Sequence, residues 1–503
     1  MELATVYSRA QQGVRATEVC VEVHITNGLP ALSIVGLPET AVRESKDRVR
    51  GALINSQFEF PSRRITINLA PADLPKEGGR FDLPIAIGIL AASGQIPNDN
   101  LHLYEFIGEL ALSGELRAVR STLPMSVACS QSQRAMICPQ SNAAEAALVS
   151  KTHVLSAQNL LEVCAHLHNK EQLPRAHAPD WVTDKLKKPD MSDVQGQLTA
   201  KRALEIAAAG GHSLLMIGPP GTGKTMLSSR LPGILPAMTE HEALETAAVA
   251  SISDHGLKPA NWRSRPFRAP HHTASGVALV GGGSNPRPGE ISLAHNGVMF
   301  LDELPEFDRK VLEVLREPLE SGSITISRAA RQAEFPARFQ LIAAMNPCPC
   351  GYLGDPQADC HCTAEQVQRY RHKISGPLLD RIDIHLEVPP IPIHLLRRQS
   401  QPAESSKHIR ARVSQSRDMQ LARNNKINAH YDNNDIEQYC QLTEPDHQLL
   451  EQAMTKLGLS MRAHQKVLKL ARTIADLDNS TRIKTDHISE ALSYRQLDRR
   501  TRI

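Results

Sequence analysis

The chain has 503 residues, which is too many for one hydrophobic core and predicts about three domains. Hydrophobic residues make up 41% of it and aromatic residues 4%, as in a globular protein with aliphatic cores, and a net charge of +3 says little about partners. No apolar run approaches the roughly 18 residues of a membrane-spanning helix, and the first residues lack the pattern of a signal peptide. We therefore expect a cytoplasmic protein that does not contact a membrane.

The first 168 residues combine strand and helix patterns. Residues 18–25 and 64–69 alternate apolar and polar side chains, as half-buried strands do. Residues 40–55 have the apolar spacing of an amphipathic helix, and the apolar residues 82–92 are typical of a buried one. This segment therefore predicts an α/β or α+β domain.

A polar stretch separates this domain from the rest of the chain. Residues 169–191 have the composition of a linker, with a basic run and three prolines, Pro174, Pro179 and Pro189. Residues 192–390 form the next predicted domain, which ends at a proline-rich segment. From residue 391 to 503 helical periodicity dominates, so we expect the last domain to be helical.

Residues 218–225, with the sequence GPPGTGKT, directly follow the apolar residues 214–217 and match the P-loop pattern G-x-x-x-x-G-K-[ST]. In this motif the backbone N–H groups of a glycine-rich turn and the N-terminus of the following helix surround phosphate oxygens. We expect Lys224 to reach the β- and γ-phosphates and Thr225 to bind Mg²⁺. The sequence therefore predicts a site for ATP and Mg²⁺ formed by Gly218, Pro219, Pro220, Gly221, Thr222, Gly223, Lys224 and Thr225.

A second apolar stretch, residues 298–301, ends in two acidic residues, as in a Walker B motif. We assign Asp302 to the Mg²⁺ shell and Glu303 to polarising the attacking water. Many buried strands end in acidic residues, but the P-loop upstream makes the functional interpretation the stronger one. A third predicted strand, residues 339–345, ends in Asn346, which is suited to orienting that water beside the γ-phosphate.

The order of P-loop, acidic strand and asparagine-tipped strand resembles that of the AAA+ ATPases. Residues 378–383 resemble the segment that carries the arginine finger in the magnesium-chelatase branch of this superfamily, and the matching residue is Arg381. Arg462 resembles the sensor 2 arginine of a C-terminal helical lid, with a surface salt bridge as the alternative. Because such a finger is supplied by the neighbouring subunit, the resemblance implies a homo-oligomeric ring, expected to be a hexamer.

Three further segments bring the resemblance closer. Residues 266–273 (PFRAPHHT), 281–290 (GGGSNPRPGE) and 294–297 (AHNG) resemble the magnesium chelatase-like ATPases, and with its N-terminal segment the whole chain resembles the YifB/ComM family. The resemblance implies an α/β fold, with an AAA+ P-loop core and a C-terminal helical lid. It also implies a ring ATPase that binds DNA and drives branch migration during the integration of DNA taken up by competent bacteria.

Residues 75–85 and 108–114 are similar to the proteolytic domain of Lon, an α+β fold of the ribosomal protein S5 domain 2 type. A Lon-type peptidase needs a serine nucleophile that a lysine activates. At the matching positions this chain has Arg80 and Leu123. We therefore expect residues 1–168 to form a Lon-protease-like domain without peptidase activity, which scaffolds the ring or guides DNA.

Four of the nine cysteines cluster within residues 348–362, and the other five are scattered as buried small residues. The cluster consists of Cys348, Cys350, Cys360 and Cys362. Four thiolates suit a tetrahedral structural Zn²⁺ site, although each C-x-C pair departs from the usual C-x₂-C spacing. Four reduced thiols in a loop are the alternative, as is a ligand set in which His361 replaces one cysteine.

Basic residues in two loops are the candidate contacts to DNA. Residues 322–339 predict a β-hairpin with Arg328 and Arg331 at its tip, and Arg287 lies in a glycine-rich segment before the acidic strand. Such side chains bind phosphates without reading the bases, so single-stranded, branched and double-stranded DNA are all candidate partners. Solvated loop arginines without a ligand are the alternative.

Two functions follow from these residues and resemblances. The preferred hypothesis is a DNA translocase or helicase, driven by ATP, that promotes branch migration during natural transformation. The alternative is a motor that remodels a protein partner, as magnesium chelatase or a chaperone does, although the chain lacks the D-x-S-x-S metal motif found in the chelatase partner. The sequence does not decide the role of two adjacent histidines, His271 and His272. They either lie near the nucleotide or have a structural role.

Overall fold

The computed structural model describes residues 3–178, 189–253, 256–283, 286–328, 331–356, 358–390 and 403–495. The chain divides into two units. The first unit comprises Met1–Thr183, Glu240–Trp262 and Arg331–Phe335, and the second comprises Asp184–Thr239, Arg263–Ala330 and Pro336–Ile503. Among the helices of the described ranges, none is long and apolar enough to cross a membrane.

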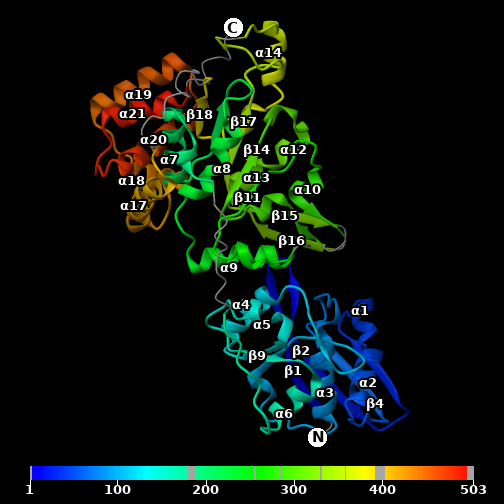
Figure 1. Ribbon diagram of the computed structural model, residues 1–503. Coiled ribbons are helices and arrows are strands. Elements are labelled where there is room, and N and C mark those ends of the chain that lie inside the picture. Colours follow the sequence, from blue (N-terminus) through cyan, green and yellow to red (C-terminus); the bar gives the residue numbers. More distant parts are fainter. Residues whose placement is uncertain are drawn as a thin grey trace. The chain divides into compact units, whose positions relative to one another are not determined.

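The first unit contains a seven-stranded mixed sheet with the order β3-β4-β2-β1-β5-β8-β9 (Figure 1, blue and cyan). Its strands are β1 (Leu3–Gln12), β2 (Arg15–Thr26), β3 (Ala31–Val35), β4 (Arg64–Ala70), β5 (Tyr104–Phe106), β8 (Ala135–Pro139) and β9 (Val154–Ala157). The strands predicted over 18–25 and 64–69 are confirmed, and they pair antiparallel as β2 and β4. Every second side chain of β2 from Val19 to Ile25 is buried, because successive residues of a strand face opposite sides.

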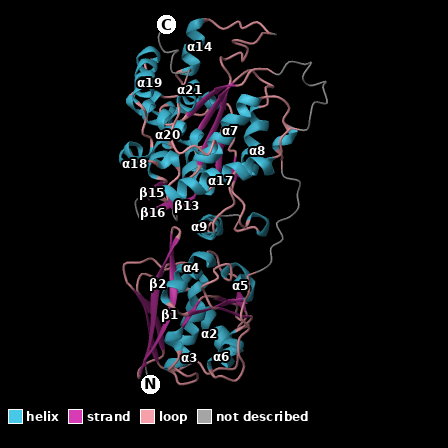
Figure 2. Ribbon diagram, turned by 90° about the vertical axis from the view of Figure 1, so that its left-hand side faces the viewer, coloured by secondary structure: helices cyan, strands magenta, loops and turns pink. Residues whose placement is uncertain are grey.

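Helices pack against this sheet, and Figure 2 shows them to one side of the β1–β2 hairpin. The helix predicted over 82–92 is buried along its whole length and packs on β1 and β2, because its residues are apolar all round. The helix predicted over 40–55 is interrupted at Glu44, where the Asp47 N–H bonds to the carbonyl three residues back, a tighter turn than in an α-helix. The helices are α1 (Thr40–Arg43), α2 (Ser45–Asn55), α3 (Asp82–Ala92), α4 (Thr122–Ser132), α5 (Gln140–Ala146) and α6 (Leu160–Leu167).

A helix from a later part of the chain completes the first unit. Helix α9 (Glu240–Ser251) follows the P-loop helix in sequence, yet its Ala247 belongs to an apolar cluster with Leu123 of α4. The Ser251 hydroxyl donates a hydrogen bond of 2.5 Å to the Glu145 carboxylate, and burial raises the pKa of Glu145. Helix α9 therefore packs with the N-terminal segment, although it lies inside the predicted ATPase range 192–390.

The second unit contains a five-stranded parallel sheet with the order β11-β14-β17-β10-β18. Its strands are β10 (Leu214–Ile217), β11 (Phe267–Arg268), β14 (Val298–Leu301), β17 (Gln340–Met345) and β18 (Ile384–Glu387). The three predicted strands of this region are confirmed, and β17 begins one residue later than expected. Because parallel strands end at the same edge of a sheet, the loops after β10, β14 and β17 meet there.

Apart from α9, the described ranges between residues 198 and 390 also contain eight α-helices and two small hairpins, and residues 331–335 of one hairpin are grouped with the first unit. The hairpin predicted over 322–339 is confirmed as a two-stranded sheet of β15 (Ser323–Arg328) and β16 (Arg331–Pro336), and a second pairs β12 (Gly281–Gly282) with β13 (Arg287–Pro288). The helices are α7 (Leu198–Gly210), α8 (Lys224–Ile234), α10 (Gly276–Val280), α11 (Glu290–Leu293), α12 (Arg309–Val314), α13 (Arg316–Ser321), α14 (Ala364–Arg371) and α15 (Gly376–Leu379).

The C-terminal part is helical across the described residues 403–495, as predicted. In Figure 1 its orange and red helices gather beside α7, and α17 and α20 pack directly on that helix. The helices are α17 (Ser406–Asn424), α18 (Asn433–Tyr439), α19 (Glu444–Leu457), α20 (Met461–Leu477) and α21 (Thr485–Ser493). We refer to these helices as the lid.

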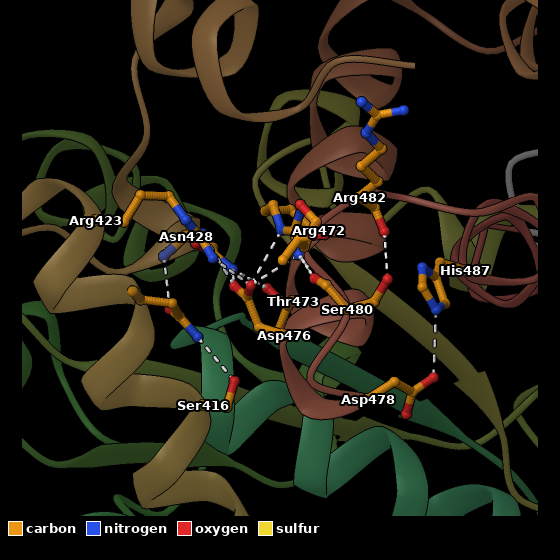
Figure 3. Close-up of polar contacts among 12 residues, drawn as sticks. Ser416, Arg423, Asn428, Arg472, Thr473, Asp476, Asp478, Ser480, Arg482 and His487 are labelled. Carbon is orange, nitrogen blue, oxygen red and sulfur yellow. Dashed lines mark hydrogen bonds and ion pairs between the residues drawn. The ribbon is translucent and has the colours of Figure 1, made fainter. Parts of the chain in front are cut away.

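A buried carboxylate joins two helices of the lid (Figure 3). Asp476 of α20 accepts hydrogen bonds from Arg472 Nε at 3.1 Å and from Asn428 Nδ2 at 2.8 Å, and it forms an ion pair with Arg423 of α17. Asp476 is 1% exposed, so its removal would leave the largely buried arginines Arg472 and Arg423 without their carboxylate partner.

We expect Asp476→Ala to lower the free energy of unfolding of the lid by about 3–5 kcal/mol, because it breaks a buried ion pair from one side. Asp478→Ala is the control, since Asp478 is half exposed and its contact with His487 is 3.4 Å long, and there the loss should stay below about 1 kcal/mol. Urea titration followed by far-UV circular dichroism measures both values. Equal losses in the two variants would contradict this account of the lid.

Candidate nucleotide-binding and hydrolysis site

The P-loop connects β10 to α8 at the carboxyl edge of the parallel sheet. Gly223 has φ 86° and is followed by the first helical residue, Lys224. A Cβ at Gly218 would lie 2.2 Å from the carbonyl oxygen of Val388, so glycine is required there. The Thr222 hydroxyl donates to the Pro219 carbonyl at 2.9 Å and fixes the turn, which leads directly into the anion-binding N-terminus of α8.

The P-loop lysine lies inside the turn. Its Nζ atom donates to the carbonyl oxygens of Gly218 at 2.7 Å and Pro219 at 2.9 Å, and to Asn346 Oδ1 at 3.3 Å. Burial lowers the pKa of Lys224, and the negative charge of Asp302 opposes this effect. Phosphate oxygens bind an ammonium group more strongly than these neutral acceptors do. The structure therefore brings Lys224 and Asn346 together beside the N-terminus of α8, which is the kind of helix end that binds phosphates.

Two oxygen ligands suited to Mg²⁺ lie next to the P-loop. The Thr225 hydroxyl donates to Asp302 Oδ2 at 2.6 Å, and the other carboxylate oxygen of Asp302 accepts from the Glu303 N–H at 3.0 Å. Mg²⁺ takes hard oxygen donors and usually binds one or two carboxylates together with substrate phosphates. Thr225 and Asp302, the two residues assigned to Mg²⁺ from the sequence, lie together and fit that donor set.

Glu303, the predicted water-polarising residue, has a partner that the sequence left undecided. It adopts φ 53° and ψ 46°, a left-handed conformation that is uncommon outside glycine. Its Oε2 atom lies 3.3 Å from Nδ1 of His272. The segment with His271 and His272 follows the short strand β11, and the pairing of β11 with β14 brings His272 to Glu303.

The predicted arginine finger is anchored within its own chain. The Arg381 guanidinium donates to the Pro377 carbonyl at 2.7 Å and forms an ion pair with Glu320, and its side chain is 11% exposed. Two residues later, Asp383 lies 2.7 Å from Lys466 Nζ of α20. Burial opposes ionisation of Asp383, but Lys466 holds the pKa of this carboxyl below its usual range. The segment that contains Arg381 and Asp383 is thus linked to helix α20 of the lid by an ion pair.

The sensor 2 candidate does not form part of this cluster. Arg462 is the second residue of α20, directly after the cap residue Ser460 and Met461, and it is exposed. Lys466, one turn further along, makes the contact between this helix and the finger segment instead. The structure therefore places Arg462 at a helix start, as predicted, without showing a ligand for it.

The four clustered cysteines come together as a possible metal site. Their sulfur atoms all lie within 4.8 Å of one another, and Cys348 Sγ is 3.3 Å from Cys350 Sγ and 3.6 Å from Cys360 Sγ. Zn–S bonds of 2.3 Å place tetrahedral thiolates roughly 3.8 Å apart, so the arrangement fits Zn²⁺. Cys362 is the fourth member of this cluster of possible ligands. His361, the alternative ligand, is not part of the cluster.

This cysteine loop touches the P-loop. A Cβ at Gly351 would lie 2.8 Å from Cδ of Pro220, so the loop backbone packs closely against the turn that surrounds phosphates. Cys348 also lies only two residues after Asn346, the partner of Lys224. The shape of the cysteine loop therefore bears on the nucleotide site from two directions.

The candidate DNA contacts lie in the two small hairpins. Arg287 begins β13 and is exposed. Arg328 ends β15 and Arg331 begins β16, as predicted for the hairpin tip, and their side chains lie outside the described residues.

The two residues expected to replace the nucleophile and base of a Lon-type peptidase, Arg80 and Leu123, are both buried. Leu123 is fully buried in an apolar cluster. Arg80 is buried, with Nη1 4.0 Å from the sulfur of Met125, and desolvation lowers the pKa of its guanidinium to about 10. Neither side chain can act as the nucleophile or base of a serine–lysine peptidase.

Comparison with known proteins gives the chain a family. The model described as "Magnesium chelatase, subunit ChlI" matches residues 190–396, "Subunit ChlI of Mg-chelatase" matches 21–142, and "Magnesium chelatase, subunit ChlI C-terminal" matches 403–495.

Two of the similar proteins match this chain over nearly its full length. Competence protein ComM of Haemophilus influenzae is 53% identical over 99% of this chain and 98% of its own. YifB of Escherichia coli is 52% identical over the same shares of both chains. The maternal DNA replication licensing factor mcm6 of Xenopus tropicalis is 24% identical over 40% of this chain and 25% of its own. Full-length identity above half, together with a P-loop, an acidic strand tip and an asparagine on a parallel sheet, shows that the chain belongs to the YifB/ComM family of magnesium chelatase-like AAA ATPases.

Proposed function

We propose that this protein is a ring-forming, ATP-dependent DNA translocase that promotes branch migration of DNA junctions during the integration of incoming DNA in natural transformation. The observation that supports it best is the gathering of hydrolytic groups at one sheet edge in a chain 53% identical to a protein named for competence. The similarity to mcm6, named a DNA replication licensing factor, also favours DNA as the substrate.

The hydrolytic step divides among these groups. Lys224 binds the β- and γ-phosphate oxygens, and Asn346, which it contacts, orients the water beside the γ-phosphate. Glu303 accepts the proton of that water. When Mg²⁺ is bound by Thr225 and Asp302, it draws negative charge from the phosphates.

Hydrolysis at a subunit interface would couple neighbouring chains in a hexamer. In this proposal Arg381 leaves Glu320 and reaches the γ-phosphate of the adjacent subunit, where a permanent planar charge stabilises the transition state. Arg462 contacts the nucleotide from the lid. Arg328, Arg331 and Arg287 grip DNA phosphates without sequence preference, so movement of the two hairpins advances the DNA.

The second candidate function is a motor that remodels a protein partner. The three family models, each described by a magnesium chelatase subunit, favour it. The two functions differ in what accelerates ATP hydrolysis, because a DNA motor responds to DNA alone and a protein remodeller does not.

One measurement, the effect of DNA on ATP turnover, separates these two functions. ATP turnover of the purified full chain should rise several-fold on addition of a 60-nucleotide single strand or a four-way junction at moderate salt. Arg287→Gln should weaken this response, since each lost phosphate contact lowers DNA affinity. Turnover that is unchanged by either DNA would exclude the translocase and leave the protein-remodelling function.

We also infer that residues 1–168 form a Lon-like domain that has lost peptidase activity and serves as a scaffold of the ring or a guide for DNA. The burial of Arg80 and Leu123 supports this interpretation. Incubation with unfolded casein and ATP should release no peptides, and peptide release by the wild type that is lost in Lys224→Ala would contradict it.

A structural zinc ion held by the four clustered cysteines is part of the proposal. Purified protein should contain about one equivalent of zinc, and Cys360→Ser should contain less than about half an equivalent, since a lost ligand weakens the site. ATP turnover of this variant should fall, because the cysteine loop packs on Pro220. Cys20→Ser, which changes a lone cysteine in β2, is the control and should keep both zinc and activity. Equal zinc contents in the two variants would refute the site.

A further inference from the structure

The finger segment, residues 378–383, joins the parallel sheet at the edge opposite the P-loop. Asp383 directly precedes β18, and its N–H donates at 3.1 Å to the carbonyl of Ser213, which directly precedes β10. The Ser213 hydroxyl donates to the Arg381 carbonyl at 3.1 Å. The P-loop follows the other end of β10, so the four residues of this strand separate it from the finger segment by about 13 Å. This position suits an arginine that acts on a neighbouring subunit.

The lid holds the finger segment at two points. Oδ1 of Asp383 lies 2.7 Å from Nζ of Lys466 on α20, and both side chains are largely buried. Arg495, which follows α21, donates to the carbonyl oxygen of Ile382 at 2.7 Å. Because charges attract each other more strongly away from water, the buried ion pair is the stronger of these two links. The position of the finger segment therefore depends on the position of the lid.

The same helix of the lid carries the candidate nucleotide contact. Lys466 follows Arg462 by four residues, and such residues lie on one face of an α-helix. A second path joins α20 to the finger segment, because Thr473 Oγ1 lies 2.8 Å from Nε2 of His212. Nδ1 of His212 in turn lies 3.2 Å from Oδ2 of Asp383. Helix α20 therefore links the proposed sensor to the carboxylate beside the finger.

The side chain of Arg381 is held less firmly than its backbone. Its ion-pair partner, Glu320, is 58% exposed, and such pairs contribute little. The Nε atom of Arg381 is buried and has no hydrogen-bond acceptor among the described residues. A buried donor without an acceptor costs free energy, and phosphate oxygens are strong acceptors for a guanidinium group. The side chain can therefore turn toward a phosphate while its backbone stays on the lid.

We propose that Lys466 is a positioning residue for the arginine finger, because its ion pair with Asp383 fixes the backbone from which Arg381 reaches the neighbouring subunit. This inference rests on the proposed role of Arg381 between subunits. Since α20 also carries Arg462, the nucleotide bound by one chain sets the finger that this chain offers to the next. Information on the bound nucleotide then passes around the ring in one direction, from the lid of one chain to the P-loop of its neighbour.

Rings mixed from two inactive variants test this direction, in the absence of DNA. Lys224→Ala chains supply the finger, and Arg381→Ala chains supply the working P-loop. Lys466→Met in the finger-supplying chain should lower the recovered turnover about 10-fold or more, since a misplacement of 1 Å can cost about 100-fold. Lys466→Met in the chain that supplies the P-loop should leave the turnover within about twofold, because that chain has no finger to position. Equal losses in the two mixtures, or a larger loss in the second, would overturn the proposal.

Thermal stability separates positioning from folding. Lys466→Met leaves Asp383 without its ammonium partner, so the melting temperature of this variant should fall. Adding Asp383→Asn to Lys466→Met removes the unpaired charge, so the double variant should melt closer to the wild type. Its ability to supply a finger should stay lost, because the link to α20 is still missing. If finger supply recovers together with the melting temperature, the ion pair only stabilises the fold and the positioning role is wrong.

Another lysine of the same helix gives the matched control. Nζ of Lys469 donates at 3.2 Å to the carbonyl oxygen of Ala429, within the lid. Lys469→Met in the finger-supplying chain should keep the recovered turnover within about twofold, since this contact does not reach the finger segment. A loss as large as that of Lys466→Met would overturn the specific role of Lys466.

The outcomes for the proposed function are distinct from these. If the two inactive variants recover no turnover on mixing, Arg381 is not a finger between subunits, and the positioning role of Lys466 is overturned together with that assignment. A wild type whose turnover does not respond to DNA would refute the DNA function alone, because the mixed rings are assayed without DNA.

Discussion

Glu303→Gln should lower kcat for ATP hydrolysis about 100-fold or more, since a positioned general base typically contributes 10²–10⁴-fold. The amide keeps the size of the side chain and loses the capacity to accept a proton. ATP should bind as well as in the wild type, because Lys224, Thr225 and Asp302 form the phosphate and Mg²⁺ contacts. Steady-state turnover together with titration of a fluorescent ATP analogue measures the two effects.

A second glutamate on the same loop provides the control for this variant. Glu306 lies three residues further on and pairs with Lys373 at 3.2 Å, on the surface. Glu306→Gln should therefore keep turnover within about twofold of the wild type, because exposed pairs contribute little. If Glu303→Gln retains more than a tenth of wild-type turnover, the assignment of Glu303 as the base is wrong.

Arg381→Ala should lower kcat about 1000-fold if this residue is the finger, since arginine fingers contribute 10³–10⁵ in kcat. Arg369→Ala is the control, because Arg369 is exposed and pairs with Glu365, one turn away. Turnover and ATP binding of both variants measure the effect.

Mixing two inactive variants tests whether the finger acts between subunits. In a ring of Arg381→Ala and Lys224→Ala chains, some sites combine an intact P-loop with an intact finger from the neighbour. Turnover should therefore reappear on mixing. If Arg381 acts within its own chain, the mixture stays inactive.

The sequence could predict which residues of the candidate nucleotide site lie together, because they belong to contiguous motifs at strand ends. A parallel sheet brings the residues after its strands to one edge, so the P-loop, Asp302 and Asn346 needed only their strands to be recognised. The cysteine cluster was equally accessible, because its members lie within 15 residues of one another.

Contacts between segments that are far apart in the sequence could not be predicted in this way. Nothing in residues 240–262 indicates that Ala247 packs with Leu123, because an apolar helix face does not specify its partner. The pair between Arg381 and Glu320 joins residues 61 apart in the sequence. Arginine and glutamate are also common on protein surfaces, so the sequence does not show that these two side chains meet. His272 was undecided because β11 has only two residues, too few to show a strand pattern, and its pairing with β14 is what brings the histidine to Glu303.

The most direct test of the account is the dissociation of a synthetic four-way DNA junction with homologous arms. Wild-type protein with ATP and Mg²⁺ should convert the labelled junction to duplex products, and Lys224→Ala and Glu303→Gln should not. Conversion should also stop when a non-hydrolysable ATP analogue replaces ATP. An intact junction after prolonged incubation with actively hydrolysing wild-type protein would contradict the proposal that ATP hydrolysis drives branch migration.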